Sequence, residues 1–330
     1  MTRALMCALC VIVSGAVLVS IWGCSAQTPE ESKDRTTGDI TIFHAGSLSL
    51  PFKDVSAAFN RKYPDVQVKA EARGTRDCAR QISDLGRSCD VFGAADYKVV
   101  ENLLMPDHAA YNVRFATNEL AIVYTDKSKY HDQITAQNWP EILLRGDAVF
   151  GRADPNRDPC GYRTCMLFQL AEKHYKQPGL AAQLADKDGD RYVRPKETDL
   201  LALLESGEID YLFVYRSVGE QHGLKILRLP DQINLGSPEF EDFYNTAAVK
   251  VTGKKPGEFV ERLGSAIVYS VTIPRNVKNR EMAEAWVSLL LSPAGQEIVK
   301  NNGQSVIAPA KVDHLDALPK ALRRYCEQEQ

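Results

Sequence analysis

The sequence predicts an α/β fold with two lobes and a ligand cleft between them. From Asp39 onward, segments of strand character alternate with segments of helical periodicity, which is typical of parallel sheets covered by helices. The chain has 330 residues, of which 44% are hydrophobic and 25% charged, so it is long enough to bury a core in each of two lobes. Open α/β sheets bind ligands beyond the carboxyl ends of their strands, so the turns from strand to helix are the places to search for a site.

The first unit has the order βαβαβ. Strands are predicted over residues 39–44, 66–70 and 89–94. A helix is expected to begin at Pro51, where apolar residues recur at helical spacing, and another is expected between Gly74 and Gly86. This order predicts a parallel sheet.

The rest of the chain continues the alternation of strands and helices, and its last part is expected to return to the first lobe. Strands are predicted over 119–125, 147–153, 211–215, 226–229 and 266–273, and helices over 159–175, 198–206, 280–291 and 292–302. We expect lobe 1 to comprise residues 39–115 and 270–330, and lobe 2 residues 116–269, with hinge strands near 115–124 and 266–273.

The N-terminus predicts export from the cytoplasm. Arg3 precedes an apolar run from Ala4 to Trp22, as in a secretory signal, and Gly23-Cys24 resembles the junction of a bacterial lipoprotein. We expect residues 1–23 to be a signal peptide, Cys24 to be the lipidation site, and residues 24–38 to be a flexible tether. An uncleaved membrane anchor is the alternative, because the run is nearly long enough to span a bilayer. Both place the protein on the extracytoplasmic, periplasmic face of a membrane.

Charge and cysteine content exclude several classes of protein. The net charge of −3 lacks the basic excess of a nucleic-acid binder. No C-x-x-C occurs, so neither a zinc ribbon nor a thioredoxin-type motif is indicated. In an oxidising compartment, Cys78 with Cys89 and Cys160 with Cys165 are candidate disulfide pairs, and Cys326 is left over; spacing alone does not decide the pairing.

Three strand-to-helix turns share the chemistry of an anion site. They are 44–47 (HAGS), Gly74-Thr75 and 158–161 (DPCG). Glycine lets the backbone approach a ligand closely, while hydroxyls and the free N–H groups of a helix N-terminus favour negative charge. The alternative for any single turn is an ordinary helix cap. Three such turns across two units favour an anion cleft.

Longer stretches resemble the periplasmic molybdate/tungstate-binding proteins of ABC transporters, particularly the tungstate-type branch. These stretches are FHAGSLSLPF (43–52), DPNRDPCGYR (154–163), RPKETDLLALLESGEIDYLFVYRSV (194–218), and IVYSVTIPRN with SPAGQ further on. The resemblance covers residues 39–312. It implies a class II periplasmic binding protein fold, no enzymatic activity and no cofactor. It also implies a monomer that captures tungstate or molybdate and delivers it to an ABC permease and its ATPase.

The same resemblance implies a set of oxyanion-binding residues. Matching positions are Gly46, Ser47, Thr75, Asp158, the N–H of Cys160, Glu197 and Tyr215, with Asp154 as the alternative to Asp158. Local roles compete with this assignment: a cap for Asp158, a solvated position for Glu197 and a core position for Tyr215.

Two carboxylates beside a dianion need an explanation. Unit charges ~4 Å apart repel by ~4 kcal/mol at an effective dielectric of 20. Either one carboxyl is protonated and donates a hydrogen bond, or Asp158 and Glu197 coordinate the molybdenum or tungsten atom of the anion. Sulfur in sulfate cannot accept such extra ligands, so coordination would discriminate against sulfate. The sequence leaves open whether tungstate or molybdate is preferred.

Two other functions fit parts of the sequence less well. Residues 186–197 imitate a calcium loop that ends at Glu197, but its sixth position is Arg191 where such a loop needs glycine. A secreted hydrolase is the other alternative. None of the six histidines lies in H-E-x-x-H and no G-x-S-x-G occurs, while His44 is near Ser47 only in sequence.

Overall fold

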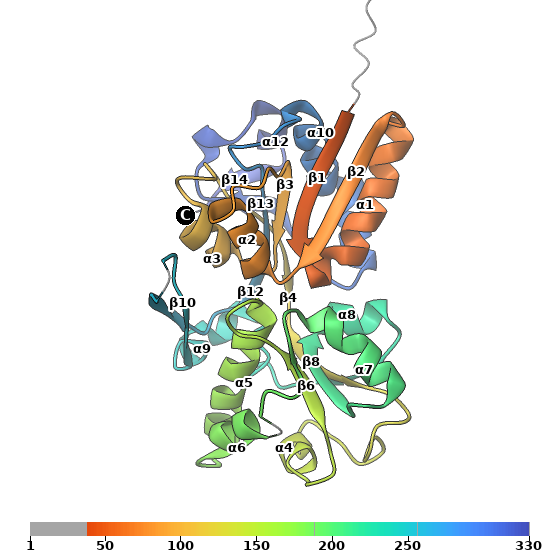
Figure 1. Cartoon of the computed structure of the whole chain (residues 1–330), viewed down its shortest axis with the longest axis vertical. Coiled ribbons are helices and arrows are strands. Elements are labelled where there is room, and N and C mark those ends of the chain that lie inside the picture. Colours follow the sequence, from red (N-terminus) through yellow and green to blue (C-terminus); the bar gives the residue numbers. More distant parts are fainter. Residues whose placement is uncertain (1–37, 188, 256, 330) are drawn as a thin grey trace, which may run out of the picture. The chain divides into compact units, whose positions relative to one another are not determined.

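The computed structural model describes residues 38–187, 189–255 and 257–329. The predicted signal peptide, Cys24 and the tether up to residue 37 lie outside the described residues. Within the described ranges, no helix is both long and apolar enough to cross a membrane. These described residues form one compact unit built around two large β-sheets (Figure 1).

The first sheet has seven strands in the order β14-β13-β4-β12-β3-β1-β2. Its strands are β1 (Gly38–Ala45), β2 (Val66–Arg73), β3 (Val91–Ala94), β4 (Val113–Asn118), β12 (Ile267–Thr272), β13 (Ser305–Val312) and β14 (Cys326–Gln328). Strands β2 and β3 both pair with β1 in parallel, which confirms the predicted βαβαβ start. Strand β12 pairs antiparallel with both β3 and β4, so the complete sheet is mixed.

Helices and short helical turns surround the first sheet. They are η1 (Gly46–Leu48), α1 (Ser49–Lys62), α2 (Thr75–Ser83), α3 (Tyr97–Val99), η2 (Val100–Leu104), α10 (Arg280–Leu291), α11 (Pro293–Asn301), η5 (Leu315–Ala317) and α12 (Lys320–Arg323). Helix α1 buries Phe52, Val55 and Phe59, the apolar positions whose helical spacing predicted it. We call this sheet and its helices lobe 1.

The second sheet has five strands in the order β7-β6-β8-β5-β9. They are β5 (Leu120–Tyr124), β6 (Phe150–Ala153), β7 (Val193–Arg194), β8 (Tyr211–Tyr215) and β9 (Lys225–Arg228). Around it lie α4 (Trp139–Leu143), α5 (Pro159–Tyr175), α6 (Leu180–Asp186), η3 (Glu197–Leu200), α7 (Leu201–Ser206), α8 (Arg216–Gln221), η4 (Pro238–Phe240) and α9 (Glu241–Tyr244). Central strand β8 is fully buried, as its apolar sequence YLFVY requires.

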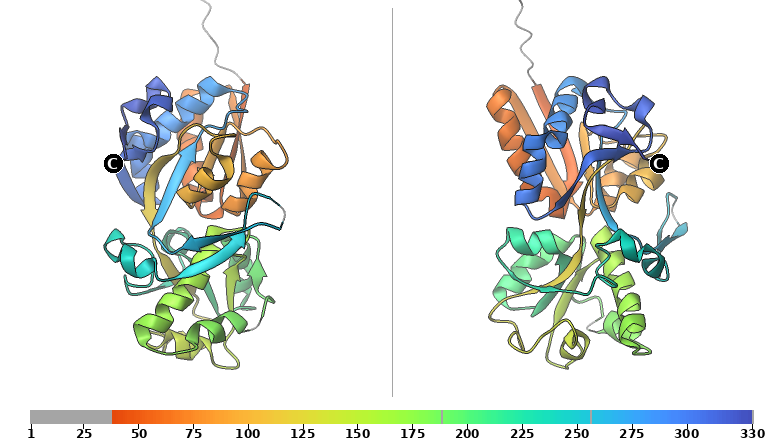
Figure 2. Two further views of the ribbon diagram at one scale, coloured as in Figure 1. Left: turned by 90° about the vertical axis from the view of Figure 1, so that its left-hand side faces the viewer. Right: turned by 180° about the vertical axis from the view of Figure 1, so that it is seen from behind.

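A two-stranded hairpin, β10 (Ala248–Thr252) and β11 (Phe259–Leu263), completes the second half. It was not predicted from the sequence. We call the second sheet, its helices and this hairpin lobe 2. Figure 2 shows the hairpin reaching from lobe 2 toward lobe 1.

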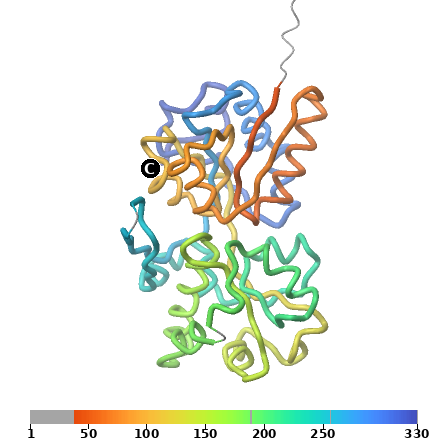
Figure 3. Tube along the Cα trace, viewed as in Figure 1, coloured from red at the N-terminus to blue at the C-terminus, as the bar shows by residue number. Residues whose placement is uncertain are grey.

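The chain passes between the lobes through two extended segments, β4 into β5 and β11 into β12 (Figure 3). The predicted hinge strands 115–124 and 266–273 coincide with these segments. The predicted lobe boundaries, 115/116 and 269/270, fall inside β4 and β12 and stay a prediction.

The candidate disulfides are absent from the described residues. Cys78, Cys89, Cys160, Cys165 and Cys326 all carry free thiols. Three of them have carbonyl acceptors instead: Cys78 Sγ lies 3.5 Å from His44 O, Cys89 Sγ 3.0 Å from Val91 O, and Cys160 Sγ 3.7 Å from Phe213 O. Burial raises the pKa of Cys78 to about 12, which keeps this thiol protonated.

Candidate functional site

The three predicted turns meet at the boundary between the lobes. Gly46 and Ser47 lie in η1 directly after β1, and Thr75 begins α2 directly after β2. From lobe 2, Asp158 caps α5, Glu197 begins η3 and Tyr215 ends β8. We call these six residues the cleft cluster.

Gly46 and Glu197 bring the two lobes into close approach. A Cβ atom added at Gly46 would lie 2.8 Å from Thr198 Oγ1 and 3.1 Å from Glu197 Oε1. Only glycine leaves room here, so the requirement is steric rather than one of unusual backbone angles.

Burial is nearly complete in the cleft cluster. Ser47, Thr75 and Tyr215 have 0% of their surface exposed, and Asp158 and Glu197 have 1%. Asp158 Oδ2 and both carboxylate oxygens of Glu197 have no hydrogen-bonding partner in the described part of the chain. Unpaired buried carboxylate oxygens are costly, so this arrangement requires a proton shared between the Asp158 and Glu197 side chains, a ligand that contacts them, or both.

Asp158 has the cap role that the sequence offered as an alternative, and its oxyanion-binding role stays a prediction. Its Oδ1 accepts a hydrogen bond from Cys160 N at 2.8 Å, which is the ordinary helix cap. The N–H of Cys160 was predicted to bind the oxyanion, but in the structure it donates to Asp158 Oδ1. Burial first, and then the negative charge of Glu197, raise the pKa of Asp158 well above its usual value.

The hydroxyls of the cleft cluster are held by buried neighbours. Thr75 Oγ1 accepts from Ala95 N at 3.2 Å. The Tyr215 hydroxyl accepts from Arg163 Nη1 at 2.8 Å, and the same nitrogen donates to Ala95 O at 2.7 Å. Arg163 therefore connects a residue of lobe 2 with the backbone that positions Thr75 in lobe 1.

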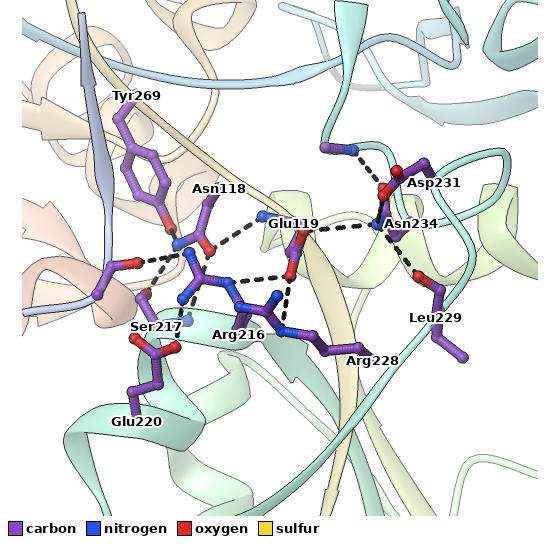
Figure 4. Close-up of polar contacts among 12 residues, drawn as sticks. Asn118, Glu119, Arg216, Ser217, Glu220, Arg228, Leu229, Asp231, Asn234 and Tyr269 are labelled. Carbon is purple, nitrogen blue, oxygen red and sulfur yellow. Dashed lines mark hydrogen bonds and ion pairs between the residues drawn. The ribbon is translucent and has the colours of Figure 1, made fainter. Parts of the chain in front are cut away.

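A second network joins Ser47 to the hinge. The Tyr269 hydroxyl donates to Ser47 Oγ at 3.0 Å, and Asn118 Nδ2 donates to the Tyr269 hydroxyl at 3.1 Å. Asn118 Nδ2 also lies 2.8 Å from Ser217 Oγ. Figure 4 shows Asn118 and Tyr269 pointing toward each other at the end of β4, beside the ion pair of Glu119 with Arg216.

Contacts around the cleft cluster hold the lobes together. The N–H groups of Arg76 and Asp77 both donate to Arg157 O, at 3.2 and 3.4 Å. The Arg157 side chain pairs with Asp77 at 2.6 Å. A Cβ atom at Gly74 would lie 2.4 Å from Arg157 O and 2.8 Å from Pro195 O, so glycine is needed for the approach of the lobes.

The inter-lobe contact at Gly74 was not predicted from the sequence, and neither were the roles of Tyr269, Asn118 and Arg163. Arg163 lies inside the DPNRDPCGYR stretch, and that stretch was the available signal for it. The alternative residue Asp154 is half-buried and accepts a hydrogen bond from Asn156 N within its own turn, outside the cleft cluster.

The calcium alternative does not match the geometry. Glu197 is buried in the cleft cluster, whereas the Asp190 side chain is 92% exposed and lies 3.7 Å from Arg152. Among the residues that the structure describes, no group of three or more His, Cys, Asp or Glu side chains is placed to hold a metal ion.

Known proteins resemble this chain over most of its length. A sequence model of the family described as bacterial extracellular solute-binding protein matches residues 40–304. An uncharacterized solute-binding protein of Petrotoga mobilis is 47% identical over 289 residues, which cover 88% of this chain and 90% of that protein. The molybdate/tungstate-binding protein WtpA of Pyrococcus abyssi is 38% identical, covering 90% and 93% of the two chains.

Solved structures share the fold at low sequence identity. The periplasmic molybdate-binding protein of Azotobacter vinelandii has a TM-score of 0.59 at 17% identity and covers 81% of this chain and 99% of that chain. The sulfate-binding protein SubI of Mycobacterium tuberculosis has a TM-score of 0.58 at 14% identity, covering 81% and 86%. These relatives are binding proteins rather than enzymes, and their two-lobed α/β fold is the predicted one. On the match across residues 40–304 and the identity to its relatives, this chain belongs to the bacterial extracellular solute-binding protein family.

Proposed function

We propose that this protein binds one tungstate or molybdate ion in the cleft cluster and delivers it to an ABC permease. The observation that carries the proposal is that Asp158 Oδ2 and both oxygens of Glu197 are buried without a donor among the described residues, and that Glu197 faces the Gly46 turn. Relatives at 36–38% identity that are named molybdate/tungstate-binding protein WtpA support the choice of oxyanion.

The proposed roles divide into donors and metal ligands. Ser47 and Thr75 donate from their hydroxyls to the oxygens of the anion, the backbone of Gly46 approaches it closely, and Tyr215 bounds the site from lobe 2. Asp158 Oδ2 and the Glu197 carboxylate coordinate the metal atom of the anion, because they are the carboxylate oxygens of the cleft cluster that accept no hydrogen bond from an N–H or hydroxyl group of the described residues. Tungsten(VI) and molybdenum(VI) can expand their coordination from four oxygens, whereas sulfur in sulfate cannot.

Nearby cations offset the negative charge of this assembly. Arg163 is buried behind Tyr215, and Arg76 is buried in the first turn of α2, next to Thr75. Neither is proposed to touch the anion. Each lowers the cost of gathering a dianion and two carboxylates in one low-dielectric region.

The test is calorimetric competition among tungstate, molybdate and sulfate. Asp158→Asn and Glu197→Gln should weaken tungstate binding at least tenfold, a loss of about 1.4 kcal/mol, and leave sulfate binding unchanged or improved. Ser47→Ala should weaken every oxyanion that binds, because it removes a general donor. X-ray absorption of the tungstate complex should show more than four oxygen neighbours. A tetrahedral shell, with selectivity unchanged in both carboxylate variants, would refute metal coordination and leave a hydrogen-bonding pocket.

The proposal also covers how the protein is attached to the membrane. We infer that lipid on Cys24 anchors the mature chain on the periplasmic side as a monomer, and that residues 24–38 give the lobes the reach to meet the permease. The Gly23-Cys24 junction in the sequence supports this inference.

A further inference from the structure

A second concentration of charge lies between the lobes, next to the cleft cluster. Arg76 and Lys98 come from lobe 1 and Arg163 and Arg262 from lobe 2, and Asp96 is the carboxylate among them. We call these five residues the cation cluster. Arg76, Asp96 and Arg163 are at most 4% exposed, and Arg262 is 9% exposed. Of these residues, Lys98, Arg163 and Arg262 line one cavity together with the Asp96 carboxylate, so three cations meet one anion there.

Asp96 is fully engaged within this cluster. Its Oδ1 accepts from Lys98 N at 2.9 Å, and its Oδ2 accepts from the Tyr162 hydroxyl and lies 3.5 Å from Arg163 Nη2. Burial opposes its ionisation, but the neighbouring cations, Arg163 foremost, keep the pKa of Asp96 below its usual value. The one carboxylate of the cluster is thus ionised and paired with Arg163.

Arg262 interacts with Asp96 only through its charge, and no hydrogen bond joins the two side chains in the described part of the chain. Arg262 is the one buried residue of β11, a strand that is otherwise exposed or half-buried. Its Nε and Nη2 have no hydrogen-bonding partner within the described ranges. Both atoms lie on one edge of the guanidinium, which is the edge that binds an acceptor with two parallel N–H bonds. Buried N–H groups without an acceptor are costly, so a missing acceptor is indicated.

A small cavity adjoins this edge. Its volume is about 10 Å³, and its polar lining consists of Asp96, Lys98, Tyr162, Arg163, Arg262 and Ser265. Lys98 Nζ donates to Ser265 Oγ at 2.9 Å, so a lobe 1 ammonium and a lobe 2 guanidinium share the cavity. This volume is at the lower limit for one water molecule and far too small for a tetrahedral oxyanion, so a monatomic ion enters only if the long side chains of Lys98 and Arg262 move apart slightly.

We propose that this cavity binds a single small monovalent anion, chloride under ordinary conditions, between Arg262 and Lys98. A water molecule would satisfy the N–H groups but would leave the excess positive charge uncompensated. Chloride satisfies both needs. Because its ligands come from different lobes, it binds the closed arrangement and stabilises it, so chloride and the oxyanion bind cooperatively. The inference goes beyond the proposed function and does not depend on which oxyanion occupies the cleft.

The direct test is bromide substitution in crystals of the whole protein. An anomalous peak beside Arg262 Nε and Nη2, separate from Ser47 and Glu197, supports the proposal. A peak confined to the cleft cluster, or no anomalous peak beside Arg262, overturns it and identifies the occupant as water.

The solution test compares sodium chloride with sodium gluconate at equal ionic strength. Wild-type protein should bind tungstate about fivefold more tightly in chloride. Arg262→Gln should lose this difference and, in gluconate, should bind at least as tightly as wild type, because an uncompensated charge has been removed. Lys98→Met is the second variant if Arg262→Gln does not fold. The control is Arg152→Gln, a lobe 2 arginine of similar burial whose side chain, 12% exposed, lies 3.7 Å from Asp190, away from the cavity.

Two results would contradict the proposal in solution: equal affinity of wild type in both salts, or an undiminished chloride effect in Arg262→Gln. Thermal unfolding in the two salts, measured without oxyanion, keeps the test separate from the proposed function. If tungstate does not bind at all, the bromide peak and a higher unfolding temperature in chloride still report on this cavity.

Discussion

The Tyr269 hydroxyl donates to Ser47 Oγ at 3.0 Å and thereby determines where the proton of Ser47 can go. Asn118 Nδ2 donates to the Tyr269 hydroxyl at 3.1 Å, so the tyrosine oxygen is occupied as an acceptor and its own proton points to Ser47. Ser47, having accepted one hydrogen bond, keeps its proton for a ligand. The hinge strand β4 is thus connected to a cleft hydroxyl through two directed hydrogen bonds.

These hydrogen bonds predict that the contribution of Tyr269 to tungstate affinity depends on the presence of Ser47. Tyr269→Phe should weaken tungstate binding by about fivefold to tenfold, the effect of one buried hydrogen bond. In a Ser47→Ala background the same substitution should have no further effect, because Tyr269 acts through that hydroxyl. Calorimetry on the four proteins of the double-mutant cycle measures the coupling. Additive losses would show that Tyr269 only supports the fold. Tyr111→Phe, a change in another buried tyrosine of lobe 1, is the control.

Gly74 should control closure of the cleft. Gly74→Ala would place a methyl carbon 2.4 Å from Arg157 O and 2.8 Å from Pro195 O. This clash should block the closed arrangement of the lobes. We expect tungstate affinity to fall by at least tenfold, about 1.4 kcal/mol, with little change in the unfolding temperature of the ligand-free protein. Small-angle scattering should show that tungstate reduces the radius of gyration of wild type but not of this variant. Gly146→Ala, where an added Cβ meets nothing within 4 Å, should behave like wild type. Normal compaction of Gly74→Ala would contradict the steric role.

His44 should make stability depend on pH. Burial lowers its pKa from 6.5 to about 4, and its Nδ1 lies 2.8 Å from Ala45 O. Between these values the unfolded chain binds a proton that the folded protein does not. The stabilisation is therefore complete above pH 6.5 and is lost as the pH falls toward about 4.

The corresponding loss in the free energy of unfolding is about 3 kcal/mol. Urea unfolding at several pH values should show a steeper decline on the acid side for wild type than for His44→Gln. The exposed residue His222 provides the control His222→Gln, which should follow wild type. Parallel curves for wild type and His44→Gln would contradict this role of His44.

Anchoring should depend on Cys24. Cys24→Ala should appear in the soluble periplasmic fraction, because the lipid attachment site is gone while the polar segment behind it is unchanged. Fractionation with an antibody to the lobes measures the distribution. Retention of the variant in the membrane would favour an uncleaved hydrophobic anchor. Cys326→Ala, a substitution near the other end of the chain, should remain membrane-bound.

The sequence predicted those site residues that lie at a recognisable turn from a strand to a helix. Gly46, Thr75 and Asp158 follow predicted strands and begin helices, so their place at the lobe boundary follows from the alternation. Glu197 was placed by resemblance, because a glutamate beside a helix start has no local feature that predicts burial. The structure shows it to be 1% exposed.

Other features depend on contacts that no local pattern contains. Tyr269 reaches Ser47 across 222 positions of sequence, and a tyrosine in an apolar strand resembles any core residue. In strand β11 Arg262 directly follows Glu261, and two adjacent charged residues are typical of a solvated segment. The neighbours of Arg262 come from both lobes, Asp96 and Lys98 from one and Tyr162 and Arg163 from the other, and no local pattern in the sequence brings these segments together.

The two N–H groups of α2 that donate to Arg157 O affect how fast a bound solute can leave the protein. The side chains of the cleft cluster have no more than 1% of their surface exposed, so a solute held among them can leave only after the lobes move apart. Breaking the contact between α2 and Arg157 O is then one part of the barrier to release, together with the contacts of the solute to both lobes. A membrane protein that pulls α2 away from the loop at 156–157 would lower this barrier without touching the solute.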